Sequence, residues 1–255
     1  DVCSSDLLPL IIWGLHRLMD ERKRWLYFVS LLILFIQNYY FGFMVAIFLV
    51  LYFLARMTYE KWSWTKVLDF VVSSALAGLS SLIMLLPMYL DLKSNNSDAL
   101  STLSGVFTEN SHLFDLFAKN FVGTYDTTQF NAIPMIYVGM MPLALAILFF
   151  FTKSIRLRSK FAFLGIIAFF VASFYLQALD LLWQGMHSPN MFLHRYAFLF
   201  SLLLVLMALE TLSRWEEIKT WHILTISLFL ITGFLATLIF GHYKYVMTSQ
   251  VMLTF

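Results

Sequence analysis

The chain has 255 residues, of which 60% are hydrophobic and only 13% are charged, and its mean hydropathy is +0.78. Soluble domains carry about a quarter charged residues, so this composition excludes a water-soluble fold. The net charge of +2 is too small to indicate nucleic acid as a partner, and the one cysteine, Cys3, excludes an intrachain disulfide.

The start of the chain does not read like the rest. Residues 1–7, which begin Asp1-Val2-Cys3, are what a common sequencing-adapter end gives when it is translated in frame. We therefore treat them as an artefact, and we expect residues 8–255 to form one transmembrane domain that lacks an upstream part. The absence of a signal peptide then says nothing about targeting.

Eight hydrophobic runs, separated by short charged clusters, follow one another along the chain. Most are long enough to cross a bilayer, and because they lack the alternation of barrel strands they are predicted to be helices. The runs lie at residues 8–19, 25–38, 41–57, 65–90, 134–152, 160–178, 194–210 and 222–240. The predicted fold is therefore an all-α integral membrane protein, a polytopic bundle of about eight transmembrane helices.

The distribution of lysine and arginine predicts how this bundle lies in the membrane. If the first helix ends in the cytoplasm, most basic residues fall on the cytoplasmic side, as the positive-inside rule requires. The basic residues that fall outside are Lys93, Lys119, Arg195 and Lys244. A polar loop at about residues 91–133 is then extracytoplasmic.

Apolar residues recur at helical spacing within this outer loop. They are Leu100, Leu103, Phe107, Leu113 or Phe114, Phe117 and Phe121. The spacing predicts one or two amphipathic helices that lie on the outer membrane surface. The alternative, which the sequence leaves open, is that the stripe packs on the transmembrane bundle.

The second predicted helix is short, and polar residues follow it. From Arg24 to Gln37 is thirteen steps, about 20 Å of helix against a hydrocarbon core of about 30 Å. The turn that follows reads Gln37-Asn38-Tyr39-Tyr40-Phe41-Gly42. These amide and phenol groups either line a recessed, outward-facing pocket or tie neighbouring helices together.

A second polar segment precedes the helix that is predicted to carry His194, Arg195 and Tyr196 in its first turns. It reads Trp183-Gln184-Gly185-Met186-His187-Ser188-Pro189-Asn190. Ser188 is a natural N-cap and Pro189 a natural first helical residue, so free N–H groups and the positive end of the helix dipole point outward. Together with Arg195 they form a place to hold an anion. The alternative is an interfacial arginine that reaches lipid phosphates.

Other candidate chemistry has little support. His187 and His194 share no recognisable spacing with acidic or cysteine ligands, so we expect no metal, and the chain has no phosphate-binding glycine loop or nucleophile elbow. No cofactor is expected. Asp180 is expected to pair with Arg195, and Asp69 to reach the cytoplasmic headgroups.

These residues together resemble YfhO-type bacterial membrane proteins, over nearly all of the chain after residue 7. One departure is Leu193-His194, where the family pattern has a proline and an aromatic residue before the Arg-Tyr pair. The resemblance rests on Leu8-Pro9-Leu10-Ile11-Ile12-Trp13-Gly14, Gln37 to Gly42, Gly123-Thr124-Tyr125-Asp126, Ile136-Tyr137-Val138-Gly139, Asp180 to Trp183, and Pro189-Asn190 with Arg195-Tyr196.

The resemblance implies a GT-C-type glycosyltransferase, a multi-pass enzyme of the bacterial cytoplasmic membrane. Such an enzyme takes a sugar from a polyprenyl-phosphate carrier and transfers it to a cell-envelope polymer, such as teichoic acid, on the outer face. The alternatives are a lipid-linked sugar flippase or transporter, and a non-catalytic envelope-assembly subunit.

The resemblance also implies roles for particular residues. Arg195, His187 and Asn190 would bind the donor phosphate. The catalytic base of such enzymes lies in a first outer loop, which would be upstream of Leu8, so it is expected to be missing here; Asp126 is a distant second choice. The other expected substrate-binding residues are Trp183, Tyr196, Gln37, Asn38, Tyr39 and Tyr40.

Overall fold

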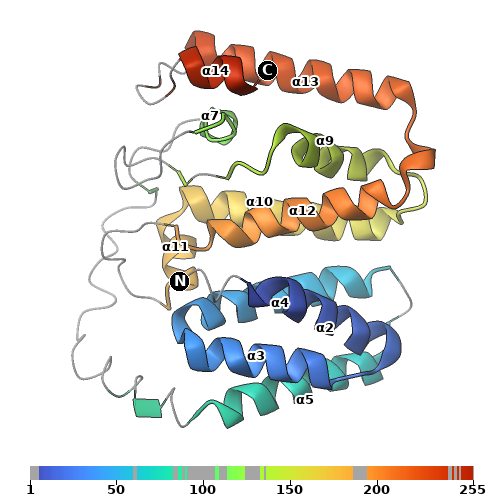
Figure 1. The fold of residues 1–255 in the computed structure, drawn as a ribbon, viewed down its shortest axis with the longest axis vertical. Coiled ribbons are helices and arrows are strands. Elements are labelled where there is room, and N and C mark those ends of the chain that lie inside the picture. Colours follow the sequence, from blue (N-terminus) through green and yellow to red (C-terminus); the bar gives the residue numbers. More distant parts are fainter. Residues whose placement is uncertain are drawn as a thin grey trace. The chain divides into compact units, whose positions relative to one another are not determined.

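Helices form nearly all of the regular structure in the computed structural model of the chain (Figure 1). The chain divides into two compact units. The first comprises Asp1–Thr102 with Trp183–His187, and the second Leu103–Leu182 with Ser188–Phe255. The structure describes residues 6–59, 62–82, 86–87, 90, 107–108, 114–123, 133–134, 136–185, 194–240, 243, 246 and 248–254.

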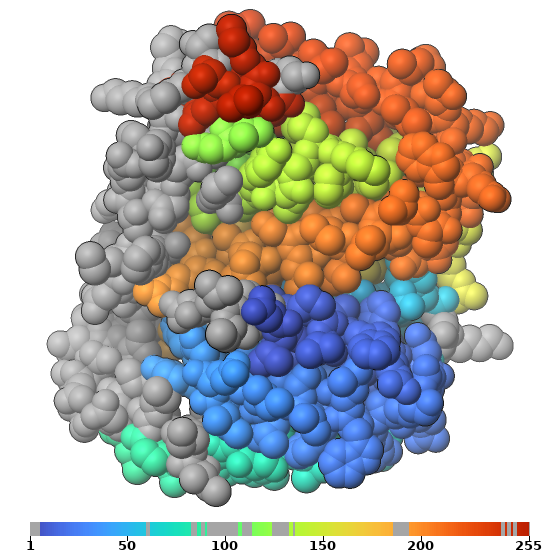
Figure 2. All heavy atoms as spheres, in the orientation of Figure 1, coloured from blue at the N-terminus to red at the C-terminus, as the bar shows by residue number. Residues whose placement is uncertain are grey.

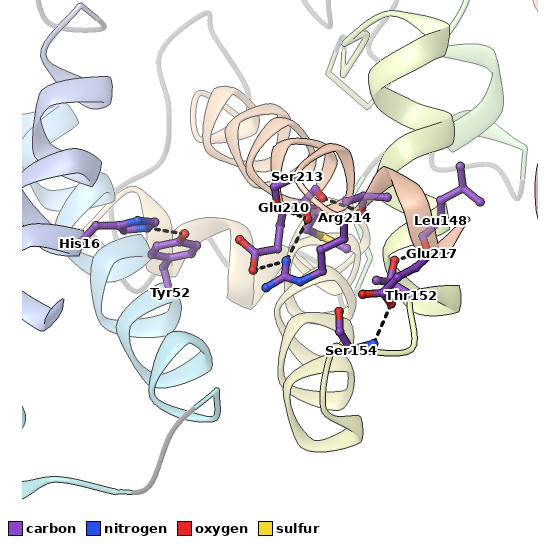
Figure 3. Close-up of polar contacts among 11 residues, drawn as sticks. His16, Tyr52, Leu148, Thr152, Ser154, Glu210, Ser213, Arg214 and Glu217 are labelled. Atoms are coloured by element: carbon purple, nitrogen blue, oxygen red, sulfur yellow. Dashed lines mark hydrogen bonds and ion pairs between the residues drawn. The ribbon is translucent and has the colours of Figure 1, made fainter. Parts of the chain in front are cut away.

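The first unit is built around a central helix. The helices are α2 (Leu7–Glu21), α3 (Trp25–Gln37), α4 (Tyr39–Met57) and α5 (Trp64–Ser80). Helix α3 packs against the other three, and α2 also contacts α5. Phe53 of α4 stacks on Phe70 of α5 with ring centroids 4.3 Å apart. His16 Nε2 of α2 lies 2.9 Å from the Tyr52 hydroxyl of α4, so a polar contact supplements the apolar packing (Figure 3).

The second unit has a core of apolar side chains from three helices. Helix α9 packs on α12 and α13, and the short α7 packs on α13. Buried members of this core include Leu145, Ala208 and Phe234. The elements are α7 (Asp115–Ala118), α9 (Met140–Leu148), η1 (Phe149–Phe151), α10 (Leu157–Tyr175), α11 (Gln177–Trp183), α12 (Ala197–Leu212), η2 (Trp215–Glu217), α13 (Thr220–Phe240) and α14 (Thr248–Thr254).

Large apolar side chains cover the outside of these helices as well as the core. On α13, Ile226, Leu230 and Phe234 are buried, whereas Leu228 is 67% exposed and Trp221 is 72% exposed (orange in Figure 2). Water disfavours so much apolar surface, and lipid does not. Helices α4, α10 and α13 are each long and apolar enough to cross a bilayer. The chain is therefore a membrane protein.

The helices agree with the hydrophobic runs that the sequence contains. Each of the eight runs contains a helix, so the all-α prediction is confirmed for the described part of the chain. Boundaries differ in places, since α9 begins at Met140, inside the run predicted to start at residue 134. Helices α3 and α12 and the stretch Met140–Phe151 are apolar but shorter than a full span. The number of membrane crossings stays a prediction.

Within each unit, the basic loops lie together at one end. In the first, Arg22 and Arg24 from the turn after α2 both bind Asp69 near the start of α5. In the second, the Ser154 N–H before α10 donates to Glu217 Oε2 of η2 across 2.9 Å (Figure 3). Hydrogen bonds from the Ser154 hydroxyl and N–H hold the pKa of Glu217 below its usual value. The positive-inside rule predicts that both of these ends face the cytoplasm.

The described part of the outer loop packs on the bundle. Phe121 is buried, and its ring meets that of Phe234 of α13 edge to face at 4.8 Å. Phe117 contacts the same ring at 5.8 Å, over Gly233, where a Cβ atom would come within 2.3 Å of it. For these two residues the structure favours packing on the bundle over a free surface helix. Leu100, Leu103 and Leu113 lie outside the described residues.

Candidate functional site

The turn that carries Arg195 is not helical, which corrects a prediction. His194, Arg195 and Tyr196 form a turn, and α12 begins only at Ala197. His194 has φ +53°, in the left-handed region that is rare for residues other than glycine. The helix therefore does not extend back through His194, Arg195 and Tyr196, where the sequence had predicted its first turns. Arg195 therefore sits in a fixed turn rather than on the first turns of a helix.

A buried network of polar groups holds this turn. The carboxylate oxygen Oδ1 of Asp180, on α11, lies 2.7 Å from Nδ1 of His194, and both side chains are buried. The Tyr196 hydroxyl lies 3.2 Å from the same nitrogen and donates to the carbonyl of Ser173 across 2.7 Å. Because an unpaired carboxylate is strongly disfavoured in an apolar interior, Asp180 and His194 constrain each other's position.

Aromatic rings enclose the polar network. Phe174 stacks on Tyr196 with centroids 5.5 Å apart and meets the ring of His194 edge to face at 6.0 Å. The outer-loop residue Thr108 fixes the end of α10 beside them, because its N–H donates to the Tyr175 carbonyl across 2.9 Å. The described surroundings of the turn are closely packed.

Arg195 is the most exposed of the three residues of this turn. It is partly exposed, whereas its neighbours His194 and Tyr196 are buried on either side. The two buried neighbours therefore anchor the backbone on both sides of Arg195. A guanidinium on a rigid support can bind a phosphate with little loss of side-chain freedom. Tyr196 itself lies inside the packing, so it contributes by positioning the turn.

The other predicted polar turn belongs to the first unit. Helix α3 ends at Gln37, as predicted, and α4 begins at Tyr39. Asn38 caps α4, since its Oδ1 accepts from the Phe41 N–H across 3.1 Å. Gln37 is exposed, while Asn38, Tyr39 and Tyr40 are partly buried. Asn38 thus has a structural task, and the side chains around it are accessible enough to line a cavity.

The remaining predicted residues differ in how far the structure places them. Trp183 is fully buried at the end of α11 and groups with the first unit. His187, Asn190 and Asp126 lie outside the described residues, as do Ser188 and Pro189 with the predicted cap. Among the residues that are described, no group of His, Cys, Asp and Glu is arranged to hold a metal ion.

The sequence did not predict the contact between His194 and Asp180 or the pairing of Asp69 with two arginines. The only feature of the sequence that could have indicated the contact with Asp180 was the unexpected His194 beside the Arg-Tyr pair. Asp69, expected at the headgroups, is only 1% exposed and binds Arg22 and Arg24 instead. Hydropathy cannot detect such a pairing, because Arg22 is 47 residues away along the chain.

Comparison with protein families identifies the chain. The model of a family described as bacterial membrane protein YfhO matches residues 6–255, which covers both units and both polar turns. No curated protein and no solved structure matches the chain.

Proposed function

This chain belongs to the YfhO family of bacterial membrane proteins, and we propose that it is an integral membrane glycosyltransferase of the cytoplasmic membrane. A hydroxyl of a cell-envelope polymer, such as teichoic acid, attacks the anomeric carbon of the sugar. The bond from that carbon to the carrier's phosphate oxygen breaks, and the polyprenyl phosphate leaves with the electron pair. The hydroxyl proton passes to a carboxylate base.

The clamped turn of Arg195 is the observation that carries the proposal. A lipid-borne phosphate lies at headgroup level, and in the predicted topology Arg195 is at the outer end of α12. The buried contacts of its neighbours His194 and Tyr196 hold the backbone of the turn, so the Arg195 side chain starts from a fixed position when it meets the leaving phosphate. His187 and Asn190, a few residues earlier, complete the proposed phosphate site.

The acceptor side of the reaction is assigned to the turn at Gln37. Gln37, Asn38, Tyr39 and Tyr40 bring amide and phenol groups to the outer end of a helix that is too short for a full span. Groups of this kind bind sugar hydroxyls by hydrogen bonds. We assign them to the wall of the outward-facing cavity.

Replacing Arg195 tests the phosphate site. In the full-length protein, Arg195→Ala should raise the KM for the polyprenyl-phosphate-linked sugar roughly 10- to 100-fold, the usual effect of losing one charge-assisted hydrogen bond. Transfer is measured with a radiolabelled donor at limiting concentration. Arg158→Ala removes an exposed guanidinium from the basic end of the second unit and should leave the KM unchanged.

Three outcomes separate the proposal from its alternatives. Unchanged transfer by Arg195→Ala at limiting donor would remove the phosphate site. Movement of the lipid carrier across vesicles without transfer of its sugar would indicate a flippase. Absence of both activities in the reconstituted full-length protein, together with loss of envelope glycosylation in cells that lack the protein, would indicate an assembly subunit.

A further inference from the structure

A basic hollow lies at the end of the first unit that is predicted to face the cytoplasm. It has a volume of about 900 Å³ and opens widely to the surroundings. The turn between α2 and α3 contributes three of its lining residues, Arg22, Lys23 and Arg24. Its lining residues are Arg17, Arg22, Lys23, Arg24, Trp25, Leu26 and Val29.

Carboxylates orient the cations of this hollow without neutralising them all. Asp69 accepts from Nε of Arg22 across 2.9 Å and also from Nη2 of Arg24. Glu21 lies 3.2 Å from Arg17 Nη2 and 2.7 Å from Lys23 Nζ. Four cationic groups therefore face two carboxylates, which leaves two positive charges in excess. Lys23 is 63% exposed, so the excess charge is open to a ligand.

An apolar pocket of about 310 Å³ adjoins the hollow. The two share Arg24 and Trp25, so a ligand that occupies one can extend into the other. The rest of the pocket comes from two helices, with Phe28 on α3 and Val72, Ser73 and Leu76 on α5. A charged site that continues into an apolar one is complementary to an amphipathic anion.

Ser73 gives the pocket a polar group at a defined depth. Its side chain is only 2% exposed, and in the part of the chain that the structure describes its Oγ has no hydrogen-bond partner. A buried hydroxyl without a partner is disfavoured, so a ligand atom that accepts from it would be stabilised there. Along α5, Ser73 follows Asp69 by one turn, about 6 Å, and Leu76 follows Ser73 by nearly another.

We propose that the hollow and the pocket together bind a glycerophospholipid with an anionic headgroup, taken from the cytoplasmic leaflet. The phosphate lies against Arg22, Lys23 and Arg24. An ester oxygen one turn deeper accepts from the Ser73 hydroxyl, and an acyl chain follows Phe28 and Leu76. This order of cations, hydroxyl and apolar wall matches phosphate, ester and chain in such a lipid. This lipid site is separate from the proposed site of sugar transfer. The two proposals share only the predicted orientation of the chain in the membrane.

Native mass spectrometry of the purified chain in detergent tests the apolar half of the site. Dioleoyl phosphatidylglycerol should remain bound at concentrations where dioleoyl phosphatidylcholine does not. Leu76→Trp fills the pocket from a side chain that is already exposed, and it should weaken retention of phosphatidylglycerol roughly tenfold, as loss of a few buried CH₂ groups predicts. Leu79→Trp changes an exposed residue of the same helix outside the pocket and should have no effect.

Three further measurements test the polar half. Arg24→Gln and Lys23→Gln should each weaken retention roughly fivefold, the usual effect of one basic residue near anionic lipid, whereas Arg158→Gln should not. Ser73→Ala should weaken retention of phosphatidylglycerol and leave that of polyprenyl phosphate, which has no ester, unchanged. Inorganic phosphate alone should not compete.

Several results would overturn the lipid site. Equal retention of phosphatidylcholine would show a surface without charge selectivity. Equal behaviour of Leu76→Trp and Leu79→Trp would remove the apolar half of the site. Competition by inorganic phosphate would show that the hollow binds a free anion and not a lipid. Tighter binding of polyprenyl phosphate than of phosphatidylglycerol would identify the lipid carrier as the occupant.

Discussion

His194 combines a rare backbone conformation with a buried contact to a carboxylate. Its φ of +53° is disfavoured for a side chain with a Cβ atom, by roughly 1–2 kcal/mol. The contact with Asp180 offsets this conformational cost, because Oδ1 of Asp180 lies only 2.7 Å from Nδ1 of His194. The strain and the pair together place Arg195 where a continuous helix would not.

A double-mutant cycle measures how strongly the pair is coupled. His194→Ala leaves the Asp180 carboxylate buried without its imidazole, and it should lower the free energy of unfolding by about 3–5 kcal/mol. Asp180→Ala should also lower the free energy of unfolding. The double variant should lower it by clearly less than the sum of the two single variants. Thermal unfolding in detergent, followed by tryptophan fluorescence, gives the three values. Additivity within about 0.5 kcal/mol would show that the two groups are independent.

At the scale of the element, a small residue decides how closely α2 and α3 can pack. A Cβ atom on Gly14 would lie 2.6 Å from the backbone nitrogen of Tyr27. A flexible side chain could move away from such a Cβ atom, but the backbone of α3 cannot. The turn of three residues between the two helices fixes their separation. The same turn presents Arg22, Lys23 and Arg24, so its geometry depends on Gly14.

Alanine at two glycines separates packing from helix propensity. Gly14→Ala should destabilise the first unit by about 1–3 kcal/mol, the usual effect of overpacking. Gly78→Ala in α5 has open space around the new methyl group and should be neutral or stabilising by up to about 1 kcal/mol. Thermal unfolding of the two variants in the same detergent is the measurement. A Gly14→Ala protein as stable as Gly78→Ala would show that α2 and α3 do not approach so closely.

Local pattern predicted some element boundaries and not others. The end of α3 at Gln37 was predictable, because an apolar run stops there at an amide and Asn38 is a good N-cap for the next helix. The start of α12 was not, because it depends on a contact between His194 and Asp180 of another helix. Whether the stripe of Phe117 would pack on the bundle was undecidable for the same reason, since the space over Gly233 appears only once α13 is folded.

At the scale of the whole molecule, the two units follow one rule. In each, a basic turn is joined to a neighbouring segment at one end of the unit: Arg22 and Arg24 bind Asp69 of α5 in the first, and the Ser154 N–H donates to Glu217 in the second. In each, the polar turn assigned to substrate lies at the other end of a helix from these basic segments. The turn at Gln37 follows α3, and the turn of Arg195 precedes α12. Both proposed sites on the outer face therefore depend on one orientation of the chain in the membrane.

Labelling of single cysteines tests that orientation. In a background with Cys3→Ser, we expect Lys93→Cys in the outer loop to react with a membrane-impermeant maleimide added to intact cells. Glu216→Cys, in the exposed η2 turn, should react only after the membrane is opened. The positive-inside rule sets this result, because the basic residues resist translocation during insertion. The reverse pattern would place Arg195 in the cytoplasm, where an outward-facing donor could not reach it, and would move the basic hollow of the first unit to the outer leaflet.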